Sequence, residues 1–126
     1  MPDVAEVDPF DLPEWLSLGE VIWTATSSLH GAHRVEGRLA GSGEELVCDL
    51  LGADQAYPRP VLDEGWRRRA HQSWTHGEVL VCRYDSRLTL AVPGSDFTAD
   101  RALEAVGRFA KAVGADPGRF LVALRL

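Results

Sequence analysis

The feature that most restricts the possible folds is a pair of stretches with apolar residues at helical spacing. Short runs that alternate between apolar and polar residues, as strands do, surround them. The first stretch spans residues 62 to 76, with an apolar residue every fourth position, and is expected to end at Gly77. Its stripe consists of Leu62, Trp66, Ala70 and Trp74. The second begins after the N-cap Thr98 and ends before Gly114. Its apolar face consists of Leu103, Val106, Ala110 and Val113. The sequence therefore predicts two firm helices in a chain whose other elements are strands.

The strand-like runs precede, separate and follow these helices. Residues 20–29, 35–39 and 46–50 predict a three-stranded meander, residues 79–84 and 87–92 predict a hairpin across Asp85-Ser86, and residues 120–126 predict a last strand. A short helical turn is expected at residues 13–16. The order (short α)-β-β-β-α-β-β-α-β indicates an α+β fold, an antiparallel sheet with both main helices on one face. The last strand is apolar on both sides, which predicts a central position.

The charge of the chain is concentrated at its N-terminus. Six of the 19 acidic residues lie in the first 20 residues, where there is no basic residue, and the remaining 13 balance the 13 basic residues. We therefore expect an acidic flexible arm over residues 1–12 and a single domain over residues 13–126. A net charge of -6 disfavours nucleic acid as a partner. No apolar run approaches the length of a membrane span and the acidic start is unlike a secretory signal, so we expect no membrane partner and a cytoplasmic location.

Three short segments resemble a known protein family. Residues 48–51 (CDLL), 57–61 (YPRPV) and 68–72 (RRAHQ) are similar to uncharacterised small proteins of actinobacteria, and the predominance of Arg over Lys fits a GC-rich bacterial genome. Over residues 14 to 113, the predicted element order also resembles the type III secretion chaperone-like fold, which a bacterial family of sensory-transduction regulators shares. The resemblance implies a chaperone-like or regulatory role and a protein partner.

The residues that most often carry chemistry form no diagnostic cluster. Cys48 and Cys82 lie in separate alternating runs, as small core residues do in a reducing compartment, and His30 and His33 lack further ligands for zinc. We therefore expect no metal and no cofactor. Asp49 lies within an apolar run, where a carboxylate needs a partner, and the nearest candidates along the chain are the arginines of residues 67–69. A structural ion pair is the favoured interpretation.

These observations favour a small non-enzymatic binding protein, an adaptor or a chaperone-like regulator, that pairs with a protein partner or as a homodimer. Trp15 and Tyr57 lie in irregular segments and are candidates for an exposed aromatic rim, whereas Trp74 could be core or ligand-binding. The candidate binding residues are Trp15, Tyr57, Arg69, His71 and Trp74. The alternative is an enzyme of unknown reaction with a polar site around the connector 49–71. Its polar groups would be Asp49, Asp54, Arg69 and His71.

Overall fold

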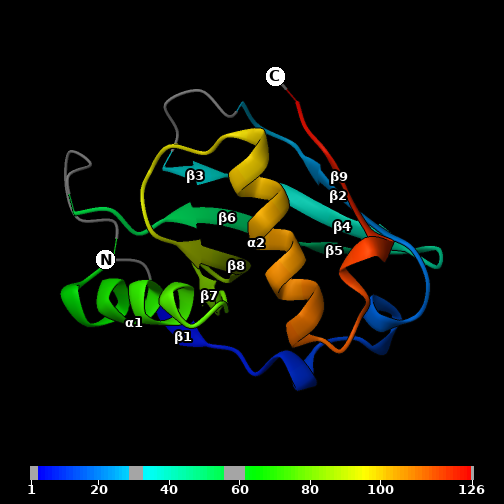
Figure 1. The fold of residues 1–126 in the computed structure, drawn as a ribbon, viewed down its shortest axis with the longest axis horizontal. Coiled ribbons are helices and arrows are strands. Elements are labelled where there is room, and N and C mark those ends of the chain that lie inside the picture. The colour runs from blue at the N-terminus through cyan, green and yellow to red at the C-terminus, as the bar shows by residue number, and fades with distance from the viewer. Residues whose placement is uncertain (1–2, 29–32, 56–61, 126) are drawn as a thin grey trace.

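The computed structural model describes residues 3–28, 33–55 and 62–125 (Figure 1). It contains two α-helices, three short 3-10 helices and nine strands among these residues. In chain order the elements are β1 (Val4–Glu6), η1 (Pro9–Asp11), η2 (Glu14–Ser17), β2 (Val21–Ala25), β3 (Arg34–Val35), β4 (Gly37–Gly41), β5 (Glu44–Val47), β6 (Asp49–Gly52), α1 (Glu64–Thr75), β7 (Leu80–Tyr84), β8 (Arg87–Val92), α2 (Ala99–Ala112), η3 (Pro117–Arg119) and β9 (Phe120–Ala123). The predicted α+β class is confirmed.

The strands form two mixed sheets. The five-stranded sheet has the order β1-β7-β8-β6-β3, and the four-stranded sheet has the order β5-β4-β2-β9. The pairs β6–β8 and β2–β9 are parallel, and the other pairs are antiparallel. The predicted single antiparallel sheet is therefore wrong. Helix α1 and strand β7 lie between β6 and β8 in the sequence, and both α-helices and six strands lie between β2 and β9. Such long connections allow strands to pair in parallel.

The two sheets are joined because two predicted strands are each split in two. The chain passes from one sheet to the other between β3 and β4 and returns between β5 and β6. At this bend the Trp23 side chain lies against Gly37, where a Cβ atom would stand 2.5 Å from the indole ring. The Trp23 indole N–H donates to the Cys48 carbonyl at 2.9 Å, and the Cys48 N–H donates to the Gly37 carbonyl at 3.0 Å. A buried tryptophan thus takes the space that a side chain at residue 37 would need.

The five-stranded sheet separates two clusters of buried side chains. Alternate residues of β7 and β8 belong to different clusters, so the clusters lie on opposite faces of the sheet. Ala70 of α1 is buried with Leu80 and Cys82, whereas the buried face of α2 groups with Val81 and Leu90. The expectation that both helices cover one face is therefore wrong: their buried residues belong to opposite sides of this sheet.

Helix α2 follows the prediction closely at its ends and less closely on its face. The Thr98 hydroxyl accepts from the Arg101 N–H at 3.2 Å, which confirms the predicted N-cap. Gly114, just beyond the helix, has a φ of +77°, a conformation that favours glycine. Leu103, predicted on the apolar face, is 53% exposed. The buried side chains are instead Ala102, Ala105, Val106, Phe109 and Ala110. The small alanines let the helix approach the sheets closely.

The two terminal strands lie at sheet edges. β9 pairs with β2 alone among the described strands, so the predicted central position is wrong. Its alternation explains the error, because Phe120 is buried whereas Leu121 is 45% exposed on the outer face. β1 pairs with β7 within the stretch expected to be a flexible arm, and Val7 packs against the larger cluster. The acidic composition of residues 1–12 gave no sign of this strand.

Candidate functional site

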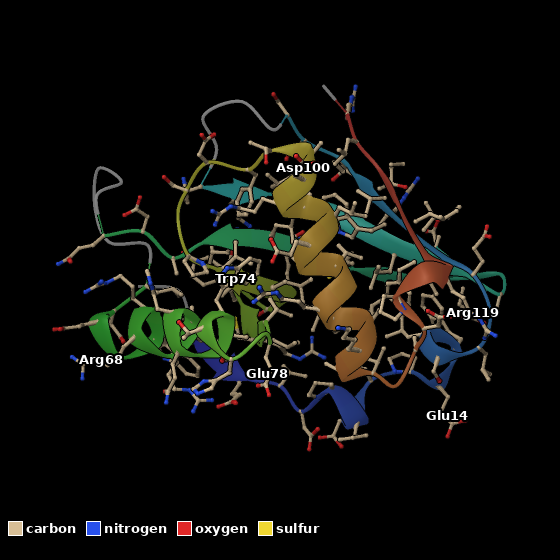
Figure 2. The ribbon with its side chains drawn as sticks, in the orientation of Figure 1. Glu14, Arg68, Trp74, Glu78, Asp100 and Arg119 are labelled. Atoms are coloured by element: carbon tan, nitrogen blue, oxygen red, sulfur yellow. The ribbon has the colours of Figure 1, made fainter. Side chains whose placement is uncertain are left out.

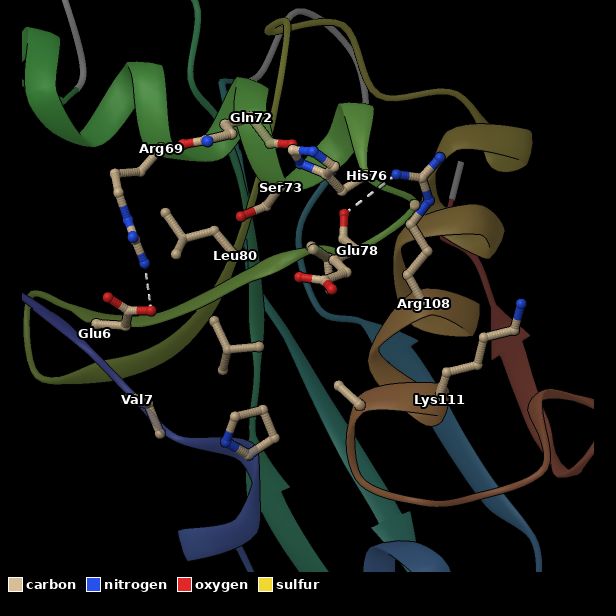
Figure 3. A pocket seen from close by; sticks show the side chains of 15 residues that line it. Glu6, Val7, Arg69, Gln72, Ser73, His76, Glu78, Leu80, Arg108 and Lys111 are labelled. Atoms are coloured by element: carbon tan, nitrogen blue, oxygen red, sulfur yellow. Dashed lines mark hydrogen bonds and ion pairs between the residues drawn. The ribbon is translucent and has the colours of Figure 1, made fainter.

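A groove of about 600 Å³ lies between β1, the C-terminal half of α1 and the last turns of α2 (Figure 3). Its floor is formed by Val79, which directly precedes β7, and by Leu80 and Val81, the first residues of β7; they are 7%, 3% and 3% exposed. Its walls carry polar side chains from three elements. The volume falls within the range of about 300 to 1,000 Å³ that is typical of ligand sites.

The helical wall of the groove follows from the apolar stripe of α1. Asp63 caps the helix by accepting from the Trp66 N–H at 3.0 Å. Ala70, on the predicted stripe, is turned into the core. A second line of residues at the spacing i, i+3, i+4 and i+7 then lies beside the stripe and faces the groove. This line consists of Arg69, Gln72, Ser73 and His76 (Figure 3).

Two arginines of the groove are held by their neighbours. Arg69 forms an ion pair with Glu6 that links α1 to β1. Arg108 donates to the Trp74 carbonyl at 2.7 Å, to the Glu78 carbonyl at 3.2 Å and to the Glu104 carboxylate at 2.7 Å. Arg108 therefore joins the end of α1 to α2, and its donors are mostly engaged.

Four other side chains of the groove make no hydrogen bond or ion pair with the described part of the chain. They offer an amide, a hydroxyl, a carboxylate and an ammonium group, and they are Gln72, Ser73, Glu78 and Lys111. The arrangement can hold a ligand by hydrogen bonds and charge.

Trp74 lies between the two helices (Figure 2). Its ring stacks on the Arg108 guanidinium, 3.6 Å from the ring centroid, and Arg101 lies 5.9 Å from it. The side chain is half-buried against the larger cluster. Its observed contacts are thus those of a wedge between α1 and α2.

The other predicted binding residues are spread over the molecule. Arg69 lines the groove, whereas Trp15 is half-buried against the larger cluster. His71 is exposed, with its Nε2 atom 3.4 Å from the Ala53 carbonyl oxygen. Tyr57 lies outside the described residues. The structure therefore brings one of the five, Arg69, to the groove, with Trp74 close behind its wall.

A second polar cluster is built around Asp49, at the other end of β7. The Asp49 carboxylate is fully buried, and each of its two oxygens accepts two hydrogen bonds. Oδ1 accepts from the Gly37 N–H at 3.1 Å and from Arg87 Nη2 at 3.0 Å, and Oδ2 accepts from Arg87 Nε at 2.6 Å and from Arg34 Nη2 at 3.0 Å. The partners predicted for Asp49, the arginines of 67–69, are wrong. The predicted interpretation, an ion pair, is confirmed.

The Asp49 cluster fastens strands together. It joins β6 to β3 and β8 and to the start of β4, and the Arg34 guanidinium also lies 5.6 Å from the centroid of the Tyr84 ring. The hydrogen bond from Arg87 to Asp49 raises the pKa of the arginine further. Because Asp49 is buried and already accepts four hydrogen bonds, it has no free position from which to take a proton from a substrate.

The residues of the alternative catalytic site do not come together. Asp49 begins β6, whereas Asp54 lies beyond its other end, where its carboxylate is 3.4 Å from the Ser95 hydroxyl. His71 lies near that same end, through its contact with Ala53. Five residues of extended chain span roughly 16 Å, so one substrate atom cannot contact both carboxylates.

Both cysteines are buried and free. Burial raises the pKa of the Cys48 thiol well above its usual range and that of Cys82 to about 12, with smaller contributions from Asp49 and Glu6. A thiol in such surroundings is a poor nucleophile, in agreement with the predicted packing role. Within residues 3–28, 33–55 and 62–125, no three His, Cys, Asp or Glu side chains are placed to hold a metal ion. No helix in the same residues is long and apolar enough to cross a membrane.

Sequence reasoning missed most of the groove. Gln72, Ser73 and Glu78 are ordinary surface residue types, and no motif sets them apart. Their spacing from Arg69 on a predicted helix was the one available signal, but the wall supplied by β1 depends on a strand that was not expected. Comparison with known proteins supplied no further guide to the site, because no family model, no curated protein and no solved structure matches this chain.

Proposed function

We propose that this chain is a non-catalytic binding protein, an adaptor or chaperone-like regulator, and that its groove holds an extended segment of a protein partner. The observation that carries the proposal is a groove at the start of β7 that is bordered by four polar side chains without partners in the described chain. The polar groups of the groove can fix the orientation of a ligand by hydrogen bonds and charge, as polar groups do in binding sites.

The end of β1 supports an extended segment as the occupant. The Val7 N–H donates to the Val81 carbonyl at 2.9 Å, after which Asp8 caps η1 and Pro9 turns the chain away. No described strand continues beside β7 past Val81 on that side. An incoming strand could take this place, a common mode of peptide recognition.

The charges of the groove favour a peptide over nucleic acid. Glu6 and Glu78 border it together with Arg69, Arg108 and Lys111, so both signs are present. A phosphate backbone would meet two carboxylates there, whereas a peptide can complement both signs. The resemblance in element order to the chaperone-like fold also points to a protein partner.

The alternative, an enzyme with a site around the connector, has less support. Asp49 is engaged by four donors, and the other polar groups of that hypothesis lie away from it. No observation in the described residues favours a particular reaction.

Disulfide trapping tests the groove directly. In Ser73→Cys the new thiol would face the groove, and in the control Ser17→Cys it would replace a half-buried serine of η2 that does not line it. Each variant is incubated with a library of thiol-bearing peptides under reversible exchange and analysed by intact mass. The native thiols should remain silent because both are buried and their pKa values are raised.

We expect Ser73→Cys to select a related set of peptides, enriched at least tenfold over the control variant. Competition by the same peptides without their thiol should reduce the trapping. Equal capture by the two variants, or capture that follows thiol reactivity alone, would overturn the proposal.

A further inference from the structure

The four edges of the two sheets differ in how they are protected. β3 has two residues and includes Arg34, β1 has three and includes Glu6, and β5 begins with Glu44 and Glu45. Shortness and charge are the usual means by which proteins prevent strand pairing at an edge. β9 has neither protection: it has four residues, Phe120–Ala123, with no charged side chain. Among the four described edge strands it is the one without either protection.

The outer face beside β9 is also apolar. Leu121 is 45% exposed and stands beside Ile22, which is 38% exposed, and Ile22 stands beside Ala40. These three residues form one row across β9, β2 and β4, because directly opposed residues share a face. The row ends at β9 with its largest apolar side chains, Leu121 and Ile22, closest to the open edge.

We propose that two copies of this chain associate through β9, in an antiparallel pair about a two-fold axis that passes at Leu121. Two copies of one edge strand that are related by a two-fold axis perpendicular to the sheet run antiparallel, so the pair closes after two copies. The two four-stranded sheets then become one continuous sheet of eight strands. The proposal goes beyond the groove and does not depend on it.

Two conditions select the register of the two β9 strands: the faces on which their side chains lie, and the charges that come to stand opposite one another. Opposed residues must share a face, so the axis passes through a residue position of β9. An axis at Val122 would place Arg119 opposite Arg125 of the second copy, and like charges directly opposite one another are destabilising. An axis at Leu121 places Arg119 opposite Ala123, and Leu121 opposite its own copy. The apolar row then runs unbroken from Ala40 of one copy to Ala40 of the other.

The interface consists of one strand pair and the side chains beside it. A pair of four-residue strands makes a small interface, and small interfaces are typical of weak, transient complexes, so the dimer should dissociate on dilution. The average mass in sedimentation equilibrium should accordingly rise from that of a monomer toward twice that value as the concentration increases. Leu121→Lys should keep the chain monomeric, since it places two like charges at the axis.

Disulfide crosslinking tests the register. In Leu121→Cys the two thiols would face each other with Cβ atoms about 5 Å apart, which is close to disulfide geometry. The matched control is Val47→Cys, a site of similar exposure (43%) on the same face but on β5, the opposite edge strand. Both side chains are partly exposed, so both variants should fold, and thermal melting checks this.

We expect mild oxidation to convert Leu121→Cys to a covalent dimer at least ten times faster than Val47→Cys. Equal rates would mean random collision or contact through the whole face, and would overturn the proposal. A wild-type chain that stays monomeric at all concentrations, or a Leu121→Lys variant that still dimerises, would also overturn it.

Discussion

The two ends of β7 carry polar clusters of opposite character. At the hairpin end, Asp49 accepts four hydrogen bonds and is completely buried, with Arg34 and Arg87 as its charged partners. At the other end, the groove exposes side chains such as Gln72, Ser73 and Glu78, which have no partner in the described chain. The Asp49 carboxylate is fully hydrogen-bonded by groups of the molecule itself, whereas the groove side chains still have donors and acceptors that can bind a ligand.

This difference separates a structural role from a binding role. A buried charge without its partners is costly, so a cluster like that of Asp49 must be complete for the chain to fold. Exposed polar groups are hydrated when no ligand is present, so they can remain unpaired at little cost and exchange water for a ligand. The comparison therefore predicts large losses of stability at the first cluster and small losses at the second.

The largest effect is expected for Asp49→Ala. This change leaves Arg34 and Arg87 without the carboxylate that pairs with them, and breaking a buried pair costs about 3 to 5 kcal/mol of the free energy of unfolding. Urea denaturation, monitored by circular dichroism, measures this loss of the free energy of unfolding. Glu78→Gln serves as the control at the groove and should change stability by less than about 0.5 kcal/mol. Similar losses in the two variants would remove the distinction between the clusters.

A smaller loss is expected for Trp74→Ala. Removal of this half-buried ring takes away its packing against the core and its stacking on Arg108, so we expect a loss of about 2 kcal/mol, below the range for a fully buried tryptophan. A double-mutant cycle with Arg108→Ala should show positive coupling between the two side chains. If stability is unchanged while peptide capture is lost, Trp74 is a ligand-binding residue and not a wedge between the helices.

Alkaline pH should reveal the buried thiols. Burial raises the pKa of Cys82 from 9.0 to about 12, so the thiol loses its proton more readily in the unfolded chain. The protonated Cys82 thiol therefore favours the folded chain. This contribution to the free energy of unfolding is complete below pH 9 and is lost as the pH rises from 9 toward 12, by about 1 kcal/mol per pH unit. The free energy of unfolding of the wild type should therefore fall more steeply between pH 9 and 10 than that of Cys82→Ala. Parallel curves would mean that Cys82 titrates normally.

The smallest effect is expected for Glu6→Gln. The ion pair between Glu6 and Arg69 is about half exposed on both sides, and such pairs contribute about 0 to 1 kcal/mol. The change should leave the melting temperature nearly constant but alter peptide trapping at the groove, because it releases Arg69. A loss of stability comparable to that of Asp49→Ala would show that this pair also fastens the fold.

Local sequence signals predicted the local structure well. The N-cap Thr98, the hairpin at Asp85-Ser86 and the stripe of α1 each depend on residues within one or two turns of chain, and the structure contains all three elements. Asp85 and Ser86 have φ values of +55° and +64°, as a tight hairpin requires.

The failures involve contacts between residues far apart in the sequence. The split of the meander depends on Trp23 filling the space at Gly37, and Asp49 is paired by Arg87, which is 38 residues away. The parallel pairing of β9 with β2 places Phe120 opposite Val21, which lies near the other end of the chain. Periodicity shows which face of a strand is apolar but not which strand lies beside it, so neither the second sheet nor the groove could be derived from it.

Amide chemical shifts of the unmodified protein, titrated with the peptides selected by trapping, test the central claim that the free end of β7 is the binding end. We predict that the largest shifts fall on Gln72, Ser73 and residues 79–81, while the amides of Arg34, Tyr84 and Arg87 stay within about a tenth of those changes. Shifts centred on the hairpin end, or spread evenly over both ends, would contradict the account.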